Sequence, residues 1–281
     1  MAKLYGKDLQ LMAARARLLA VDAVHTAASG HPGGSLSCMD IVTALYFNEM
    51  KVEPANPLWK DRDRFVLSKG HCAPALYSVL ALRGYFPVGD LKLLRSIEGH
   101  ISGHPDMQHV PGVDMSTGSL GQGLSTAVGM ALAAKLKAQD HRCYALCGDG
   151  EVEEGQIWEA AMAAAKWHLD NLCVFVDVNG LQIDGRTADV MPSEPLDKKF
   201  EAFNWNVIKI DGHDFDRILS ALDSARSFKG APTAILASTV KGKGVSFMEG
   251  QAGWHGKAPN DEQFAQAKAE LEAKIKELEG N

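Results

Sequence analysis

Two continuous apolar runs, each ending in a polar, glycine-containing turn, place the strongest constraint on the fold of this chain. The run "YALC" leads into Gly148-Asp149-Gly150, and the run "NLCVFVDV" leads into Asn179-Gly180. An apolar run without alternation is typical of a strand that is buried on both faces, as in a parallel sheet covered by helices. Because parallel strands end at a common sheet edge, we expect the two turns to lie close together there.

Stretches with helical periodicity alternate with strand-like runs along the rest of the chain. We predict helices over about 8–28, 38–50 (capped by Ser37), 121–137, 155–168, 214–227 and 260–279, and one more in "SKGHCAPALYSVLALRG". We predict further strands at 64–67, in "NWNVIKIDG" and in "PTAILASTV". The order predicts an α/β fold with a parallel sheet flanked by helices. We expect one domain over 1–281, with an N-terminal helical portion, an irregular segment at 99–118 and a C-terminal tail helix.

Composition narrows the class of protein. The 281 residues include 46% hydrophobic and 23% charged residues, with a net charge of −6, which argues against a non-specific nucleic-acid surface. The start "MAKLYGKDLQ" lacks the apolar core of a signal peptide, and we find no run long enough to span a membrane. Five scattered cysteines without a CxxC pair favour free thiols in a reducing compartment. We therefore expect a cytoplasmic protein with no nucleic-acid or membrane partner.

The loop "GDGEVEEGQ" lies where a phosphate could bind, but its side chains are acidic. A helix start after a glycine turn offers free N–H groups to an anion, yet this loop carries Asp149, Glu151, Glu153 and Glu154 and no Lys or Arg. A divalent cation between the acid and a phosphate would remove the repulsion. Asp149 alone could equally be a helix cap. The amide of Asn179 at the next strand end favours the metal site.

Four of the ten histidines lie in loops that contain glycine or proline. They are His31 in "SGHPGG", His71 in "SKGHCAP", His104 in "SGHPD" and His255 in "GWHGK". Flanking glycine lets the backbone bring an imidazole to a ligand, and imidazole transfers protons near neutral pH. The remaining six we expect to be surface or packing residues: His25, His100, His109, His141, His168 and His213.

The GDG turn followed about thirty residues later by Asn179 resembles the thiamine-diphosphate signature, with Val178 where many versions have a second Asn. Eight motifs also occur in the order found in transketolases: "SGHPGGSLS", "SKGH", "GHPD", "TGSLGQGLSTAVGMALA", "GDGEVEEGQIWEA", "DVNGLQIDG", "VKGKG" and "WHGK". From about residue 8 to 260 the chain thus resembles the N-terminal, diphosphate-binding part of a transketolase.

This resemblance implies thiamine diphosphate and Mg²⁺ as cofactors, with Ca²⁺ or Mn²⁺ as alternative metals. It implies that Asp149, Asn179 and the main-chain carbonyl of Leu181 bind the metal. The residues implied to hold the cofactor are His71, Gly118, Ser119, Leu120, Gly150, Glu154, Asn179, Lys241 and His255.

The resemblance also implies the catalytic set. His31 and His104 match histidines that face the sugar hydroxyls, and His104 and His255 are the leading proton carriers. Glu154 matches a glutamate at the interface with the cofactor and a second subunit. Glu151 and Glu153 we expect to be solvated acids that complement the helix dipole.

A transketolase transfers a two-carbon ketol unit from a ketose phosphate to an aldose phosphate, and pentose phosphates are the sugars that the family implies. A full transketolase is more than twice as long as this chain. We therefore expect a split enzyme, in which a second chain supplies the pyrimidine-binding and C-terminal domains of an α2β2 assembly. Four alternatives stay open: a fragment of a longer enzyme, a 2-oxo acid dehydrogenase α subunit, a deoxyxylulose-phosphate synthase relative, and a non-catalytic homologue.

Overall fold

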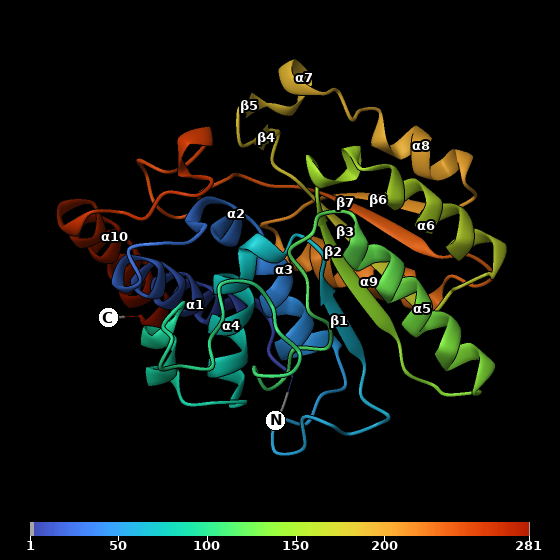
Figure 1. Ribbon diagram of the computed structural model, residues 1–281, viewed down its shortest axis with the longest axis horizontal. Helices are drawn as coiled ribbons and strands as arrows, with labels where there is room; N and C mark the ends of the chain where they lie inside the picture. Colours follow the sequence, from blue (N-terminus) through green and yellow to red (C-terminus); the bar gives the residue numbers. More distant parts are fainter. Residues whose placement is uncertain (1–2, 281) are drawn as a thin grey trace.

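A five-stranded parallel sheet forms the centre of the computed structural model, which describes residues 3–280 (Figure 1). The spatial order of its strands is β1-β2-β3-β7-β6, and every neighbouring pair is parallel. Their bounds are β1 Arg64–Leu67, β2 Cys143–Gly148, β3 Leu172–Val178, β6 Asn206–Asp211 and β7 Thr233–Ser238. The predicted α/β class and all five predicted strands are confirmed.

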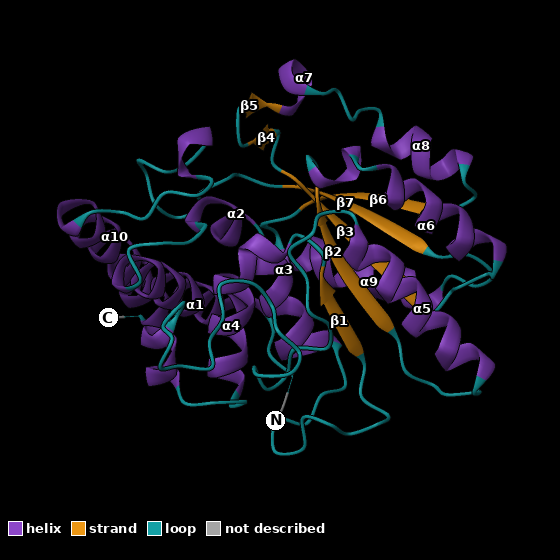
Figure 2. Cartoon of the chain, in the orientation of Figure 1, coloured by secondary structure: helices purple, strands orange, loops and turns teal. Residues whose placement is uncertain are grey.

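Helices cover both faces of this sheet (Figure 2). Along β3, Phe175 faces one apolar core, whereas Val174 and Val176 face the other. The first core includes α1 (Gly6–Thr26), α3 (Met39–Ala44), α4 (Ala73–Arg83) and α9 (Phe215–Ser227), and the second includes α5 (Gln122–Leu136), α6 (Gly155–Lys166) and α8 (Leu196–Ala202). Because both faces are buried, the strands need apolar residues at every position, which explains the continuous runs in the sequence.

The C-terminal helix α10 (Asp261–Glu279) packs beside α1, as the red and blue helices show in Figure 1. It starts with a capping box, in which the Asn260 side chain accepts from the Gln263 N–H and the Gln263 side chain accepts from the Asn260 N–H. Its buried residues are Ala267, Leu271 and Leu278, which form the narrow apolar stripe of an otherwise charged helix. The predicted tail helix is therefore confirmed.

The helix predicted over about 38–50 is present as α3, which continues into a π-helical turn, η1 (Leu45–Glu49), but its predicted cap by Ser37 is wrong. Ser37 instead ends a separate short helix, α2 (Pro32–Ser37). Pro32 occupies the first turn of α2, where its fixed φ favours an earlier start than the sequence pattern indicates. The Ser37 hydroxyl donates 2.9 Å to the carbonyl of Gly34 and 2.5 Å to Asp177, so it is not a cap.

Short elements beyond the carboxyl ends of the strands have no counterpart in the prediction. The hairpin of β4 (Leu181–Gln182) and β5 (Gly185–Arg186) leads into α7 (Thr187–Val190), at the top of Figure 1. Elsewhere in the described residues, 3₁₀ turns occur at η2 Gly70–Cys72, η3 Val88–Leu93, η4 Glu151–Glu153 and η5 Ala252–Trp254. The segment 99–118 has no helix or strand, as expected.

Two observations bear on the environment of the protein. None of the helices in residues 3–280 combines the length and the apolar character that crossing a membrane requires. All five cysteines are buried and free: Cys38, Cys72, Cys143, Cys147 and Cys173.

The burial of β3 on both faces yields a stability prediction. Phe175 is 0% exposed, so we expect Phe175→Ala to lower the free energy of unfolding by about 3–5 kcal/mol through lost apolar burial and a cavity. Phe228→Ala is the matched control, because Phe228 is 41% exposed, and it should cost less than about 1 kcal/mol. Urea unfolding followed by circular dichroism measures both. Equal losses in the two variants would contradict the two-faced burial of β3.

Candidate functional site

The register of β2 and β3 brings the two polar turns together at one sheet edge. Gly148 lies opposite Asp177, and the Asp149 N–H donates 3.2 Å to the Asp177 carbonyl. Asn179 follows directly after β3 ends at Val178. Asp149 and Asn179 therefore stand at adjacent strand ends, where parallel α/β sheets bind ligands.

Asp149 is almost fully buried, with 3% of its surface exposed. Its Oδ2 accepts from the Gly180 N–H at 2.5 Å, and its Oδ1 accepts from the Gly150 N–H at 3.0 Å. Burial, followed by the negative charge of Asp177, raises the pKa of Asp149 to about 6, whereas the Gly180 N–H and the Lys69 ammonium oppose this rise. A cation beside this carboxylate would offset the cost of burying its charge.

Two further oxygens face the same recess. The Asn179 Oδ1 accepts from the Leu181 N–H at 3.1 Å, and the Leu181 carbonyl accepts from the Lys241 ammonium at 3.2 Å. Asp149, Asn179, Leu181 and Lys241 all line this recess, which has a volume of about 80 Å³. Carboxylate, amide and carbonyl oxygens are the ligands that hard divalent cations prefer. The set therefore fits a divalent metal beside a phosphate.

Within residues 3–280, no three His, Cys, Asp or Glu residues are grouped so that they could hold a metal ion. A metal at the sheet edge would depend on Asp149 with neutral oxygens, which suits a cation that also binds phosphate oxygens.

The four loop histidines form one cluster beside the recess. The ring centroid of His31 lies 5.3 Å from that of His71, 6.0 Å from that of His104 and 5.4 Å from that of His255. The rings of His71 and His255 stack at 4.8 Å, and His255 Nδ1 lies 3.1 Å from the Lys241 ammonium. The structure thus gathers histidines from sequence positions more than 200 residues apart.

Burial lowers the pKa of three of these imidazoles. Desolvation, followed by the charge of His71, lowers the pKa of His31 to about 4. Desolvation, followed by the Lys241 ammonium, lowers the pKa of His255 to about 3. The pKa of His104 is also lowered, first by burial and then by Arg95. Neutral imidazoles can accept protons, as general bases must.

The "GSL" turn lies between the histidine cluster and the loop before α4. Gly118 has φ +141°, and a Cβ there would lie 3.0 Å from the His104 ring, which restricts this position to glycine. A Cβ on Gly70 would lie 2.6 Å from the Gly118 nitrogen. Leu120 lines the recess, whereas the side chain of Ser119 is exposed. The two glycines allow the close approach that places this turn at the recess.

The prediction that Glu151 is a solvated acid is wrong. Glu151 is 3% exposed, and its carboxylate accepts from the Ser68 hydroxyl at 2.5 Å and from the N–H groups of Gly121 and Gly148, each at 3.0 Å. Three donors around a glycine turn make burial of this charge possible. Glu151 therefore fastens the GDG turn to two neighbouring loops.

The other two acids of this loop differ from Glu151. Glu153 is half-buried and accepts 2.8 Å from the Gln182 amide, so it is not freely solvated as expected. Glu154 is exposed at the N-cap position of α6, and its side chain forms no hydrogen bond within residues 3–280. Its place at the surface leaves it accessible to another chain.

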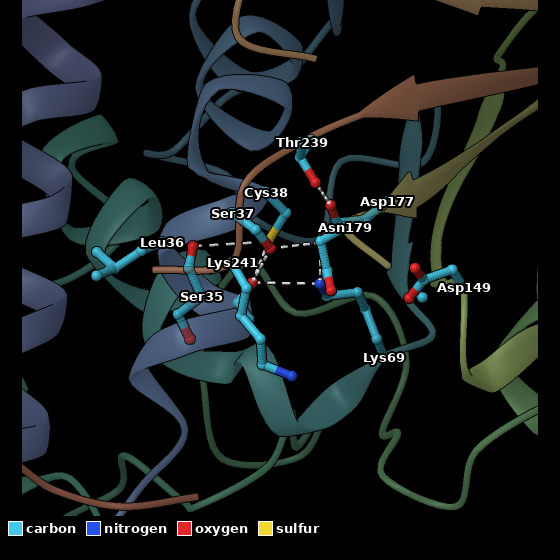
Figure 3. Close-up of polar contacts among 12 residues, drawn as sticks. Ser35, Leu36, Ser37, Cys38, Lys69, Asp149, Asp177, Asn179, Thr239 and Lys241 are labelled. Carbon is cyan, nitrogen blue, oxygen red and sulfur yellow. Dashed lines mark hydrogen bonds and ion pairs between the residues drawn. The ribbon is translucent and has the colours of Figure 1, made fainter. Parts of the chain in front are cut away.

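The buried ion pair between Lys69 and Asp177 at the recess was not predicted from the sequence. The Lys69 ammonium donates to Asp177, and the side chains are 2% and 0% exposed (Figure 3). Asp177 interrupts the apolar run "VFVDVNG", and a charge inside a buried strand requires a partner. That interruption is the signal that could have revealed the pair.

The sequence and structure match known transketolases. The family model described as "Transketolase, thiamine diphosphate binding domain" matches residues 9–278. The chain is 49% identical over 265 residues to the 6-deoxy-6-sulfo-D-fructose transketolase subunit of a Clostridium species, covering 94% of this chain and 96% of the relative. It is 43% identical over 273 residues to an apulose-4-phosphate transketolase subunit of Phocaeicola vulgatus, covering 97% of each.

Solved structures agree on the fold. The transketolase of Campylobacter jejuni superposes with a TM-score of 0.89 at 36% identity, covering 98% of this chain and 46% of that chain. The transketolase of Leishmania mexicana gives 0.88 at 33% identity, covering 97% and 45%. This chain thus spans nearly all of the two named subunits but less than half of these two transketolase structures. The chain belongs to the transketolase family and contains its thiamine diphosphate binding domain, and transketolases are enzymes that transfer ketol groups.

Proposed function

We propose that this chain binds the diphosphate end of thiamine diphosphate and, with a C-terminal subunit, transfers a two-carbon ketol unit from a ketose to an aldose. One observation carries the proposal: the oxygens of Asp149, Asn179 and Leu181, just beyond the ends of β2 and β3, lie beside the cluster of four loop histidines. The residues 1–281 act as one diphosphate-binding domain.

Asp149, Asn179 and the Leu181 carbonyl are proposed to hold Mg²⁺, and Ca²⁺ or Mn²⁺ could replace it. The Gly150 N–H, His71 and the turn of Gly118, Ser119 and Leu120 would hold the cofactor together with Lys241. When bound, thiamine diphosphate supplies the electron sink that breaking a ketose carbon–carbon bond requires.

The histidines of the cluster are proposed to bind and deprotonate the sugar. His31 orients the hydroxyl groups, and His104 and His255 accept and return their protons, a task that needs a neutral imidazole. His255 lines the recess and contacts the Lys241 ammonium, which supports a place beside the cofactor. Glu154, exposed at the start of α6, is proposed to contact the cofactor and the partner subunit.

A second chain is proposed to complete the site in an α2β2 assembly. Relatives that this chain covers almost end to end are named as subunits. The recess of about 80 Å³ encloses only part of a thiamine diphosphate molecule. Exposed Ile183, Val190 and Met191 lie in the segment beyond the carboxyl edge of the sheet, where a partner could cover them. We propose that the complex works in the cytoplasm.

The donor sugar is proposed to be a ketose phosphate or another anionic ketose, with an aldose phosphate as acceptor. Two relatives are named for anionic ketoses, one a sulfonate and one a phosphate. Pentose phosphates are the sugars predicted from the sequence. Because of the named relatives, branched and sulfonated ketoses should be tested as donors together with pentose phosphates.

Purified subunits test the split-enzyme proposal. We expect ketol transfer from a ketose phosphate to an aldose phosphate only when this chain is mixed with its C-terminal subunit, thiamine diphosphate and Mg²⁺, since this chain supplies only part of the site. A coupled assay of the aldose released measures the rate. Robust transfer by this chain alone would rule out the proposal.

The metal site is tested by Asp149→Ala. Because this change removes the charged ligand, we expect the affinity of the assembled enzyme for thiamine diphosphate at fixed Mg²⁺ to fall about 100-fold or more. Asp216→Ala, at an exposed position of α9, is the control and should leave the affinity unchanged. Isothermal titration calorimetry gives both values. Unchanged affinity in Asp149→Ala would remove Asp149 from the metal site.

The neutral histidines predict a pH dependence of stability. Since the folded-state pKa values of His31 (about 4) and His255 (about 3) lie below the unfolded value of about 6.5, the unfolded chain binds more protons in acid. Stability should therefore fall as pH drops from about 6.5 toward 4, and less steeply in the double variant H31Q/H255Q. Urea unfolding across this range measures the slopes, and identical slopes would argue against neutral histidines.

A further inference from the structure

Lys69 and Asp177 form a buried ion pair that none of the proposed roles uses. Lys69 precedes η2, and Asp177 lies near the end of β3, 108 residues later in the chain. Charges this deeply buried are costly, and a buried ion pair is often no more stabilising than apolar residues of similar size. Stability alone is therefore a weak explanation for the pair.

Asp177 joins four separate parts of the fold (Figure 3). Its Oδ2 accepts from the Lys69 ammonium and, at 2.5 Å, from the Ser37 hydroxyl at the end of α2. Its Oδ1 accepts from the hydroxyl of Thr239, directly after β7. The carboxylate therefore fixes α2, the loop before α4 and the ends of β3 and β7 relative to one another.

The same carboxylate contacts the side chain of Asn179. The amide nitrogen of Asn179 lies 3.5 Å from Asp177 Oδ2, and its oxygen accepts from the Leu181 N–H. An amide can face a neighbour with either its oxygen or its nitrogen, and only the nitrogen can donate to a carboxylate. Asp177 thereby turns the Asn179 oxygen away from itself and toward the recess.

Lys69 supplies the charge balance for this arrangement. Its ammonium also donates 3.2 Å to the Gly34 carbonyl, and a Cβ on Gly34 would lie 3.7 Å from the ammonium and 3.4 Å from His71 Nε2. Lys69 also lines the recess, so its positive charge lies in the recess wall. Without it, Asp177 would place a second uncompensated negative charge beside Asp149, where an anionic diphosphate has to bind.

We propose that Lys69 and Asp177 are positioning residues for the metal and diphosphate: Asp177 orients the Asn179 oxygen, and Lys69 cancels the negative charge of Asp177. The inference rests on the proposed function. It assigns Asp177 an effect on cofactor affinity through Asn179, and Lys69 an effect through the charge that it places in the recess wall.

Asp177→Asn tests the inference in the assembled enzyme. This change keeps the shape but removes the charge that orients Asn179, so we expect the Kd for Mg²⁺ at saturating thiamine diphosphate to rise about 10- to 100-fold. Asp114→Asn is the matched control: Asp114 is also buried, with its Oδ1 2.5 Å from Arg62, but it packs at the start of β1, away from the recess. Intrinsic tryptophan fluorescence during Mg²⁺ titration measures the Kd, and thermal unfolding measures the stability of each variant.

The control separates positioning from mere stabilisation. Both variants should lower the melting temperature. Only Asp177→Asn should weaken Mg²⁺ binding, and the Kd of Asp114→Asn should stay within about twofold of the wild-type Kd. Lys69→Met should weaken binding more than K69M/D177N, because the single change leaves a buried carboxylate unpaired. Equal Kd values for wild type and Asp177→Asn, or equal weakening by Asp114→Asn, would overturn the inference.

A milder pair of variants covers the case in which Asp177→Asn does not fold. Thr239→Val removes one donor to Asp177 and should raise the Kd for Mg²⁺ severalfold, whereas Thr126→Val, on α5, should not change it. An unchanged Kd in Thr239→Val would count against the inference. If the wild-type enzyme itself does not bind thiamine diphosphate with Mg²⁺, the proposed function fails, and this inference fails with it.

Discussion

The parallel pairing of β2 with β3 forces two carboxylates together at one sheet edge, and the rest of the site depends on how their charge is neutralised. Asp149 and Asp177 are both buried, and each accepts several hydrogen bonds. Asp177 has an internal counter-charge in Lys69, whereas Asp149 opens to the recess. This asymmetry leaves one carboxylate for an external cation and uses the other to hold the framework.

Buried hydrogen bonds fix the loops around these two acids, and the histidine cluster lies beside them. Glu151 fastens the GDG turn to the loops around it, and Asp177 joins the ends of β3 and β7 to α2. The histidine cluster lies beside this framework, and burial lowers the pKa of its members His31 and His255. A site held in this way needs little reorganisation when charge develops during a reaction, which is how enzymes lower barriers electrostatically.

The sequence predicts the parts of this structure that follow from periodicity and turn chemistry. It predicts the five strands, most of the helices and the meeting of Asp149 with Asn179, because buried strands and their glycine turns have local signatures. It does not predict the β4–β5 hairpin, whose two-residue strands show no period. The predictions for Ser37 and Glu151 are wrong because local pattern favours a cap or a solvated acid, while tertiary donors and acceptors decide their positions. Asp177 interrupts a buried apolar run and so signals that a partner is needed, but its identity as Lys69, 108 residues away, depends on the tertiary fold.

The central claim is that the ends of β2 and β3 hold a divalent metal through Asp149, Asn179 and the Leu181 carbonyl. The most direct test is a crystal structure of the assembled enzyme with thiamine diphosphate and Mn²⁺, with anomalous diffraction collected at the manganese edge. The account predicts an anomalous peak within bonding distance of these three oxygens and of the diphosphate. A bound cofactor with the manganese peak at another set of residues would contradict it.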